Sequence, residues 1–105
     1  MEPKKPQMTI DQGAAITRGI PREPLRSYVP SRTHKGQPHL VDLEENNFNG
    51  QCSCRHFETR LAPLIREPDW EPCAETRCWH ILCAREAFLN RTLKQVAAQA
   101  NGVKS

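Results

Sequence analysis

Aromatic side chains and long apolar runs are scarce in this chain of 105 residues. Only six aromatic residues occur, and no stretch approaches the roughly 20 apolar residues that a membrane-spanning helix requires. The first six residues include two lysines and two prolines, so the apolar run of a secretory signal is also missing. We therefore expect a cytoplasmic protein with no membrane partner, in a compartment that keeps thiols reduced.

Apolar residues are sparsest near the N-terminus, where six of the nine prolines fall within the first 38 residues. We interpret residues 1–24 as a mostly disordered basic tail and residues 102–105 as a short C-terminal tail. The remaining segment, residues 25–101, is too small for a hydrophobic core alone to stabilise it well, so a metal or a disulfide is expected. The five cysteines are an odd number, which does not suit a disulfide framework. A bound metal is therefore the expected source of the additional stability.

The net charge of +3 is unevenly distributed along the chain. Residues 1–40 carry seven Lys/Arg against three Asp/Glu, whereas residues 41–83 carry four against eight. Residues 84–105 are basic again, with four against one. Two basic segments flanking an acidic middle permit contact with nucleic acid but do not require it.

The residue pattern predicts a small α+β domain. Strand-forming residues occur at 26–29 and 39–43, and the Asn49-Gly50 turn leads into a third short strand at 51–54. Three prolines bound loops and one helical turn in an insert at 58–77. Apolar residues then recur at helical spacing over 79–100. The predicted fold is a short antiparallel β-meander followed by one long C-terminal α-helix, with a mostly disordered N-terminal tail.

Two pairs of metal-binding residues share a spacing of one intervening residue. They are Cys52 with Cys54 and Cys78 with His80. In an extended strand the side chains at i and i+2 leave the same face, so both sulfurs of the first pair can converge on one ion. The second pair lies where the chain enters the predicted helix. Three thiolates and one imidazole favour a closed, tetrahedral zinc site over calcium or magnesium, so we predict one structural Zn²⁺ ion.

The order Cys-x-Cys, a variable stretch and Cys-x-His resembles the SWIM zinc-finger family. The likeness covers roughly residues 27–88 and includes the preceding strand pair, Phe57 and the helix that follows Cys78. It implies a strand–strand–helix zinc fold with the four residues named above as ligands. The chain departs from the family pattern in its acidic, proline-containing insert and in two extra cysteines, Cys73 and Cys83.

Three further residues are alternative metal ligands. Cys73 could replace Cys78, and Cys83 forms an i, i+3 pair with His80 on the predicted helix. His56 lies two residues beyond the first pair and could substitute for its first cysteine. Simpler roles are a buried core thiol for Cys83, a loop cysteine for Cys73 and a surface histidine for His56.

The aromatic residues and the two remaining histidines have more ordinary predicted roles. Trp70 lies in a proline-bounded loop and is either a partner-binding anchor or a buried plug. No site is assigned to His34 or His39. Three aromatic side chains are predicted to pack beside the metal: Phe57, Trp79 and Phe88.

The predicted function is that of a structural zinc-binding interaction module, an accessory protein that binds nucleic acid (DNA) or a larger protein partner. Members of the SWIM family bind DNA or proteins, often within chromatin-remodelling ATPases and transposases, so the resemblance implies an accessory role. Four protein ligands leave no open coordination position, which a catalytic zinc needs. No carboxylate pair, nucleophile–base pair or phosphate loop is recognisable, so we expect neither enzymatic activity nor a small-molecule substrate.

The predicted contacts to nucleic acid come from basic residues of the helix. These are Arg85, Arg91 and Lys94. The acidic stretch at 41–83 argues against a continuous basic surface, so a protein–protein adaptor without nucleic-acid contact is the main alternative. A thiol-based redox sensor that uses Cys73 and Cys83, or a hydrolytic zinc enzyme with an incomplete ligand set, are lesser alternatives.

Overall fold

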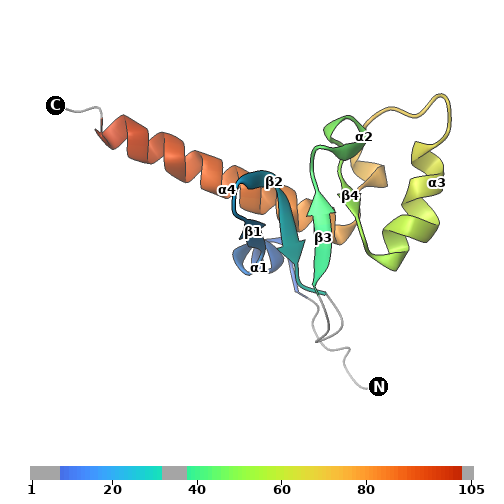
Figure 1. Cartoon of the computed structure of the whole chain (residues 1–105), viewed down its shortest axis with the longest axis horizontal. Coiled ribbons are helices and arrows are strands. Elements are labelled where there is room, and N and C mark those ends of the chain that lie inside the picture. The colour runs from blue at the N-terminus through green and yellow to red at the C-terminus, as the bar shows by residue number, and fades with distance from the viewer. Residues whose placement is uncertain (1–7, 32–37, 103–105) are drawn as a thin grey trace, which may run out of the picture.

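The computed structural model describes residues 8–31 and 38–102, with side chains up to residue 97. The predictions for residues 1–7, for His34 and for residues 103–105 lie outside this part of the chain. The described residues form a four-stranded antiparallel sheet in the order β1-β2-β3-β4, which packs against one long C-terminal helix, α4 (Figure 1). The predicted fold class is therefore confirmed.

The centre of the sheet is formed by β2 (Glu23–Val29) and β3 (His39–Asp42), which pair in antiparallel register. Across the pair, Arg26 Nε donates to the carboxylate of Asp42 at 2.9 Å on the exposed face. Side chains alternate between this face and the core, as expected for strands covered on one side. The fully buried inward residues are Ser27, Val29 and Val41.

The chain reverses between β3 and β4 (Gln51–Cys52) through α2 (Glu45–Phe48), a tight turn with left-handed backbone. Gly50 follows with φ +104°, and a Cβ atom there would lie 2.8 Å from Ile81 Cγ2. Only glycine suits both the backbone conformation and this close approach to α4. The predicted hairpin turn is thus also a packing contact between the sheet and the helix.

α4 (Trp79–Gly102) has 24 residues, and only its first half packs against the sheet. Ile81 and Ala84 are fully buried in the core, whereas Leu89, Leu93 and Val96 are 50%, 65% and 57% exposed. The second half projects beyond the sheet toward the C-terminus (Figure 1). No helix among the described residues is long and apolar enough to cross a membrane.

The insert forms short helical turns between β4 and α4. These are η1 (Phe57–Leu61), α3 (Ala62–Ile65) and η2 (Ala74–Thr76). Phe57 and Leu61 are buried in the core. Trp70 is half-buried, and its indole Nε1 donates to Thr76 Oγ1 at 3.3 Å, so this residue plugs the loop.

Residues 8–24 differ from the expected disordered tail. α1 (Ile10–Ala15) packs against α4, and β1 (Arg18–Ile20) adds a fourth strand beside β2. Thr9 caps α1 by accepting from the backbone of Gln12, whose own side chain accepts from the N–H of Thr9. α1 is held by close approach of Gly13 to α4 rather than by large apolar side chains, which is why its apolar residues suggested at most a transient helical turn and not a docked helix.

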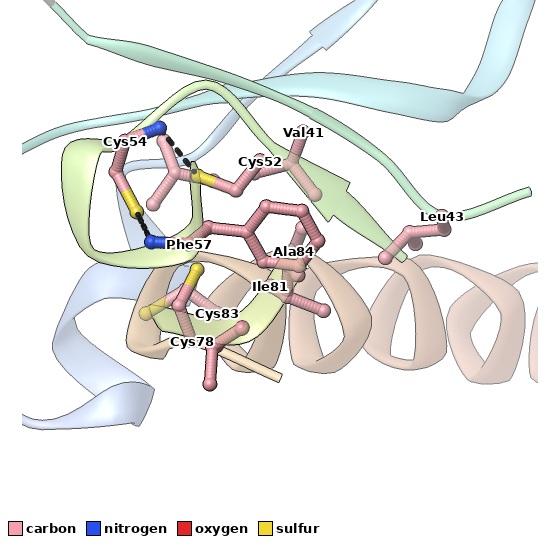
Figure 2. Close-up of a cluster of buried hydrophobic side chains, with 11 residues drawn as sticks. Val41, Leu43, Cys52, Cys54, Phe57, Cys78, Ile81, Cys83 and Ala84 are labelled. Carbon is pink, nitrogen blue, oxygen red and sulfur yellow. Dashed lines mark hydrogen bonds between the residues drawn. The ribbon is translucent and has the colours of Figure 1, made fainter. Parts of the chain in front are cut away.

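The core lies between the inner face of the sheet and the first half of α4 (Figure 2). Phe57 is buried in it, and Trp79 packs half-buried at its edge. Phe88 was predicted to lie beside the metal but instead lines a pocket with Leu25 and Leu43. Three of the buried members of this core are the cysteines of the two predicted metal-binding pairs. The candidate metal site is therefore continuous with the hydrophobic core.

Candidate metal centre

The structure brings together the two Cys/His pairs. The ligand atoms of Cys52, Cys54, Cys78 and His80 all lie within 4.8 Å of one another, from two parts of the chain separated by the insert. A tetrahedral zinc ion with Zn–S bonds of about 2.3 Å holds its sulfurs about 3.8 Å apart. The observed spacing therefore needs an adjustment of only about an ångström. The four residues are positioned to bind one metal ion.

The first pair converges through a turn rather than through a strand. β4 ends at Cys52, because Ser53 closes the ladder: its N–H donates to Leu40 O, and its Oγ accepts from Leu40 N–H, both at 3.1 Å. The chain then bends, and Cys54 N–H donates to the sulfur of Cys52 at 3.4 Å (Figure 2). The prediction of a strand over 51–54 is thus wrong at its end, since the turn aims the second sulfur.

Cys54 is the N-terminal cap of the helical segment that leads into the insert. Its carbonyl accepts from Glu58 N–H at 3.1 Å, and its sulfur accepts from Phe57 N–H at 3.3 Å (Figure 2). This is the geometry in which a cap side chain satisfies a free amide of the first helical turn. A helix N-terminus carries partial positive charge and so stabilises a thiolate placed there.

Cys78 repeats this arrangement at the start of α4. Its carbonyl accepts from Leu82 N–H at 3.1 Å, and its sulfur accepts from the backbone of Ile81. His80 lies in the first turn, with Nδ1 3.9 Å from the Cys78 sulfur. The N-termini of two helical segments, one before and one after the insert in the sequence, therefore face the candidate site. Each contributes one cysteine sulfur.

Hydrogen bonds among the three thiols shift their pKa values in different directions. Hydrogen bonds from Cys52 and then Cys78 lower the pKa of Cys54, with help from His80 and the Phe57 amide. The pKa of Cys52 is raised, first because it donates to Cys54 and then because it donates to Cys78. For Cys78, the bond from Cys52 acts to lower the pKa, but donation to Cys54 and burial outweigh it and raise the pKa to about 11. The shared hydrogen bonds thus favour the thiolate at Cys54 over thiolates at Cys52 and Cys78.

His80 has a histidine neighbour that the sequence analysis did not place in the site. The rings of His39 and His80 lie 4.5 Å apart at a tilt of 58°. Burial, and then the charge of His80, lower the pKa of His39. His80 Nε2 is buried and has no hydrogen-bond partner in the described part of the chain. Because burying an unpaired polar atom is costly, a metal bound through Nε2 would compensate this atom, whereas a metal bound through Nδ1, the nitrogen 3.9 Å from the Cys78 sulfur, would leave it unpaired.

The three alternative ligands lie outside this group of donors. Cys83 is fully buried in the core, next to Gly13 of α1. Cys73 is half-buried in the insert, where its sulfur lies 3.4 Å from Thr76 Oγ1. His56 is exposed. The simpler roles predicted for these residues agree with their positions.

Asn49 ties the insert to the hairpin and was missed as part of the site. Its side chain is fully buried, and Nδ2 donates to Thr76 Oγ1 at 2.8 Å. Oδ1 accepts from Cys73 N–H at 2.8 Å, and the Asn49 carbonyl accepts from Arg77 Nε at 3.2 Å. These bonds hold the segment just before Cys78 against the turn just before Cys52. The Asn-Gly signal predicted the turn but not this tether.

The basic residues predicted to contact nucleic acid all lie on α4. Arg85 is half-buried, whereas Arg91 and Lys94 are exposed in the second half of the helix. The Arg91 guanidinium lies over Gly19 of β1, so a side chain at residue 19 would collide with it.

The donor set fits a zinc ion. Three sulfurs and one imidazole are the ligands that tetrahedral zinc prefers, and each sulfur already accepts a backbone N–H that would offset thiolate charge. No protein-family model, curated protein or solved structure matches this chain. The assignment of a function therefore depends on the site and its surroundings.

Proposed function

We propose that this chain is a structural zinc-binding module of the SWIM type that acts as an accessory protein by binding DNA or a protein partner. The observation that carries the proposal is the group of four donors within 4.8 Å, with two of its cysteines capping helix N-termini. Such a site holds the hairpin, the insert and α4 together through one ion. The metal would thereby supply folding free energy that so small a core lacks.

A structural role is favoured over a catalytic one by the ligand count and by burial. Four protein ligands complete a tetrahedral shell, so no coordination position remains for a water molecule. The three cysteines are buried in the hydrophobic core. We therefore propose that the module performs no catalysis.

The SWIM assignment is supported by the order of structural elements. An antiparallel strand pair precedes the first ligand pair, and the second pair opens a long helix. The insert at 58–77 and the added α1 and β1 are elaborations on that plan.

Surface features of α4 support each of the two partner classes. Arg91 and Lys94 in the second half of α4 are exposed and suit phosphate contacts, which favours DNA. Exposed apolar residues on the same half suit a protein partner, and a protein–protein adaptor is the second candidate.

The experiment that tests the metal proposal measures metal content and coordination. Purified protein should contain one zinc ion per chain, and cobalt substitution should give a four-coordinate spectrum that added anions do not change. A chain without stoichiometric metal, or a cobalt spectrum that shifts on adding anions, would contradict a closed structural site. Gel-shift titration with duplex DNA at several salt concentrations then tests the nucleic-acid partner.

A further inference from the structure

An apolar groove lies between the turn α2 and the middle of α4, on a surface separate from the metal centre. Its volume is about 180 Å³, and Leu43, only 5% exposed, forms its floor. Phe48 and Leu89 stand at its edges, 60% and 50% exposed. The full lining is Leu25, Leu43, Phe48, Arg85, Phe88 and Leu89.

The backbone that presents Phe48 is strained. Asn46, Asn47 and Phe48 are consecutive residues with φ of 56°, 54° and 64°. Asparagine tolerates this left-handed conformation, but a phenylalanine there is an outlier. Strain of this kind persists where the fold gains from it, and it clusters at binding sites. Here the strained backbone holds the Phe48 side chain at the edge of the groove. Because this side chain is mostly exposed, burial in the protein's own core does not offset the strain.

One arginine of this surface makes no ion pair. Arg85 lines the groove. Among the described side chains, the ion pairs are made only by Arg26. Arg85 therefore has no carboxylate partner in this part of the chain. A ligand that brings a carboxylate would complement it.

The size and chemistry of the groove favour an apolar side chain over a small molecule or a base. Sites for drug-sized ligands occupy about 300–1,000 Å³, whereas a cavity of about 150 Å³ accepts a benzene-sized group. The groove thus has room for one Leu- or Phe-sized side chain. A nucleobase would bury polar edges against leucine and phenylalanine, where most of them would lack partners.

The apolar surface continues from the groove along α4. Leu89, Leu93 and Val96 follow the i, i+4, i+7 spacing that places side chains on one helix face, and all three are exposed. A second helix lying beside α4 would cover this stripe. A second copy of the chain is a poor candidate, because residues 84–105 carry four basic residues against one acidic residue and would repel their own kind.

We propose that the groove and the α4 stripe together bind an acidic amphipathic helix of another protein, with one bulky apolar residue inserted between Phe48 and Leu89 and a carboxylate on Arg85. This inference rests on the proposed function in taking the chain as an interaction module, and it names the partner class. The partner helix packs its apolar face on Leu89, Leu93 and Val96.

The probe is a fluorescein-labelled, capped peptide of about 18 residues, long enough to form an isolated helix. It carries leucines at i, i+3 and i+7 with glutamates beside them. Two matched peptides replace every glutamate by glutamine or by lysine. Fluorescence anisotropy with the zinc-loaded full chain should show the glutamate peptide binding about tenfold tighter than the glutamine peptide. This advantage should shrink between about 50 mM and 300 mM salt, since screening weakens exposed charge pairs.

Substitutions at the groove should change the affinity in distinct ways. Leu89→Ser and Phe48→Ser should each weaken binding of the glutamate peptide about tenfold or more, because each removes apolar contact area. Arg85→Glu should reverse the preference toward the lysine peptide. The matched controls are Leu64→Ser on α3, which is 51% exposed, and Arg60→Glu on η1, and neither should change the affinity.

Zinc content and circular dichroism, measured for every variant, separate this inference from the proposed function. Peptide binding through these residues by a chain that holds no zinc would overturn the zinc module and support the groove. A zinc-loaded chain that ignores the glutamate peptide would overturn the groove alone. So would groove variants that bind as tightly as the unchanged protein, duplex DNA that binds through Arg85 while the peptide does not, or a homodimer that buries Leu89.

Discussion

Replacing Gly13 by alanine tests whether α1 is an integral part of the fold. An added Cβ atom at this position would lie 2.5 Å from the Cys83 sulfur and 2.9 Å from the Trp79 ring. Cys83 is fully buried and has no room to move aside without disturbing the core. The added methyl group must therefore push α1 away from α4 or distort the packing beneath it.

Two opposing effects determine the size of the change. Alanine inside a helix is favoured over glycine by about 0.5–1 kcal/mol, whereas overpacking a well-filled contact costs about 1–3 kcal/mol. The steric conflict should outweigh the gain in helix propensity, so the free energy of unfolding should fall by about 1 kcal/mol. The loss cannot exceed the free energy with which α1 docks, since this short helix can detach while the sheet and α4 stay folded. For a domain of this size, the melting temperature should fall by about 4–8 °C.

The assay compares thermal unfolding and amide exchange of the zinc-loaded proteins. Exchange should accelerate at Ile16 and Thr17, whose amides donate to the carbonyls of Gly13 and Ala14 at 3.3 Å. Ala15→Gly, at an exposed position of the same helix, is the control and should cost only the propensity difference of about 0.5–1 kcal/mol. If Gly13→Ala instead stabilised the protein by that amount, α1 would be a solvated helix and the packing argument would be refuted.

Further predictions concern the metal centre. Cys54→Ala or His80→Ala should abolish metal binding and unfold the sheet and α4. Cys83→Ala should keep the metal and lose about 1 kcal/mol of stability. Circular dichroism with and without a chelator distinguishes these outcomes. Zinc binding at pH 7 should release about three protons, one from each thiol of an unfolded metal-free chain whose thiol pKa values are near 8.5, so affinity should rise with pH. Calorimetry in buffers of different ionisation enthalpy would count them. A release near two would contradict the expected unfolding of the metal-free chain, because a folded chain in which the pKa of Cys54 is lowered has fewer protons to release. Asn49→Leu should cost about 2–4 kcal/mol, because it leaves buried partners unsatisfied. Asn90→Leu, at an exposed position of α4, is the control and should cost far less, and urea midpoints of the zinc-loaded proteins would show whether the tether matters.

The sequence predicted those features that depend on local pattern. Alternation in the strands, helical spacing after Cys78 and the Asn-Gly turn are properties of neighbouring residues, so the meander and α4 could be recognised without tertiary information. The paired spacing of cysteines and histidine likewise indicated which side chains would meet. In each case a short segment contains the whole signal.

Contacts between distant segments escaped prediction. α1 is held by the absence of a side chain at Gly13, and a missing Cβ atom leaves no trace in hydrophobicity. The sulfurs of Cys54 and Cys78 act as helix caps, and this became visible only from where each helix begins. The contact between His39 and His80 joins residues 41 positions apart, through pairing of β3 in the sheet.

Residue types and their spacing thus decided the chemistry of this protein: three thiols and an imidazole in two pairs, a meander and a long helix. Their spatial relation was decided by long-range packing, which brought two helix N-termini to one point, drew Asn49 beneath the insert and left half of α4 uncovered. The physical reason is that ligand identity belongs to single side chains, whereas convergence depends on how separate segments bury one another.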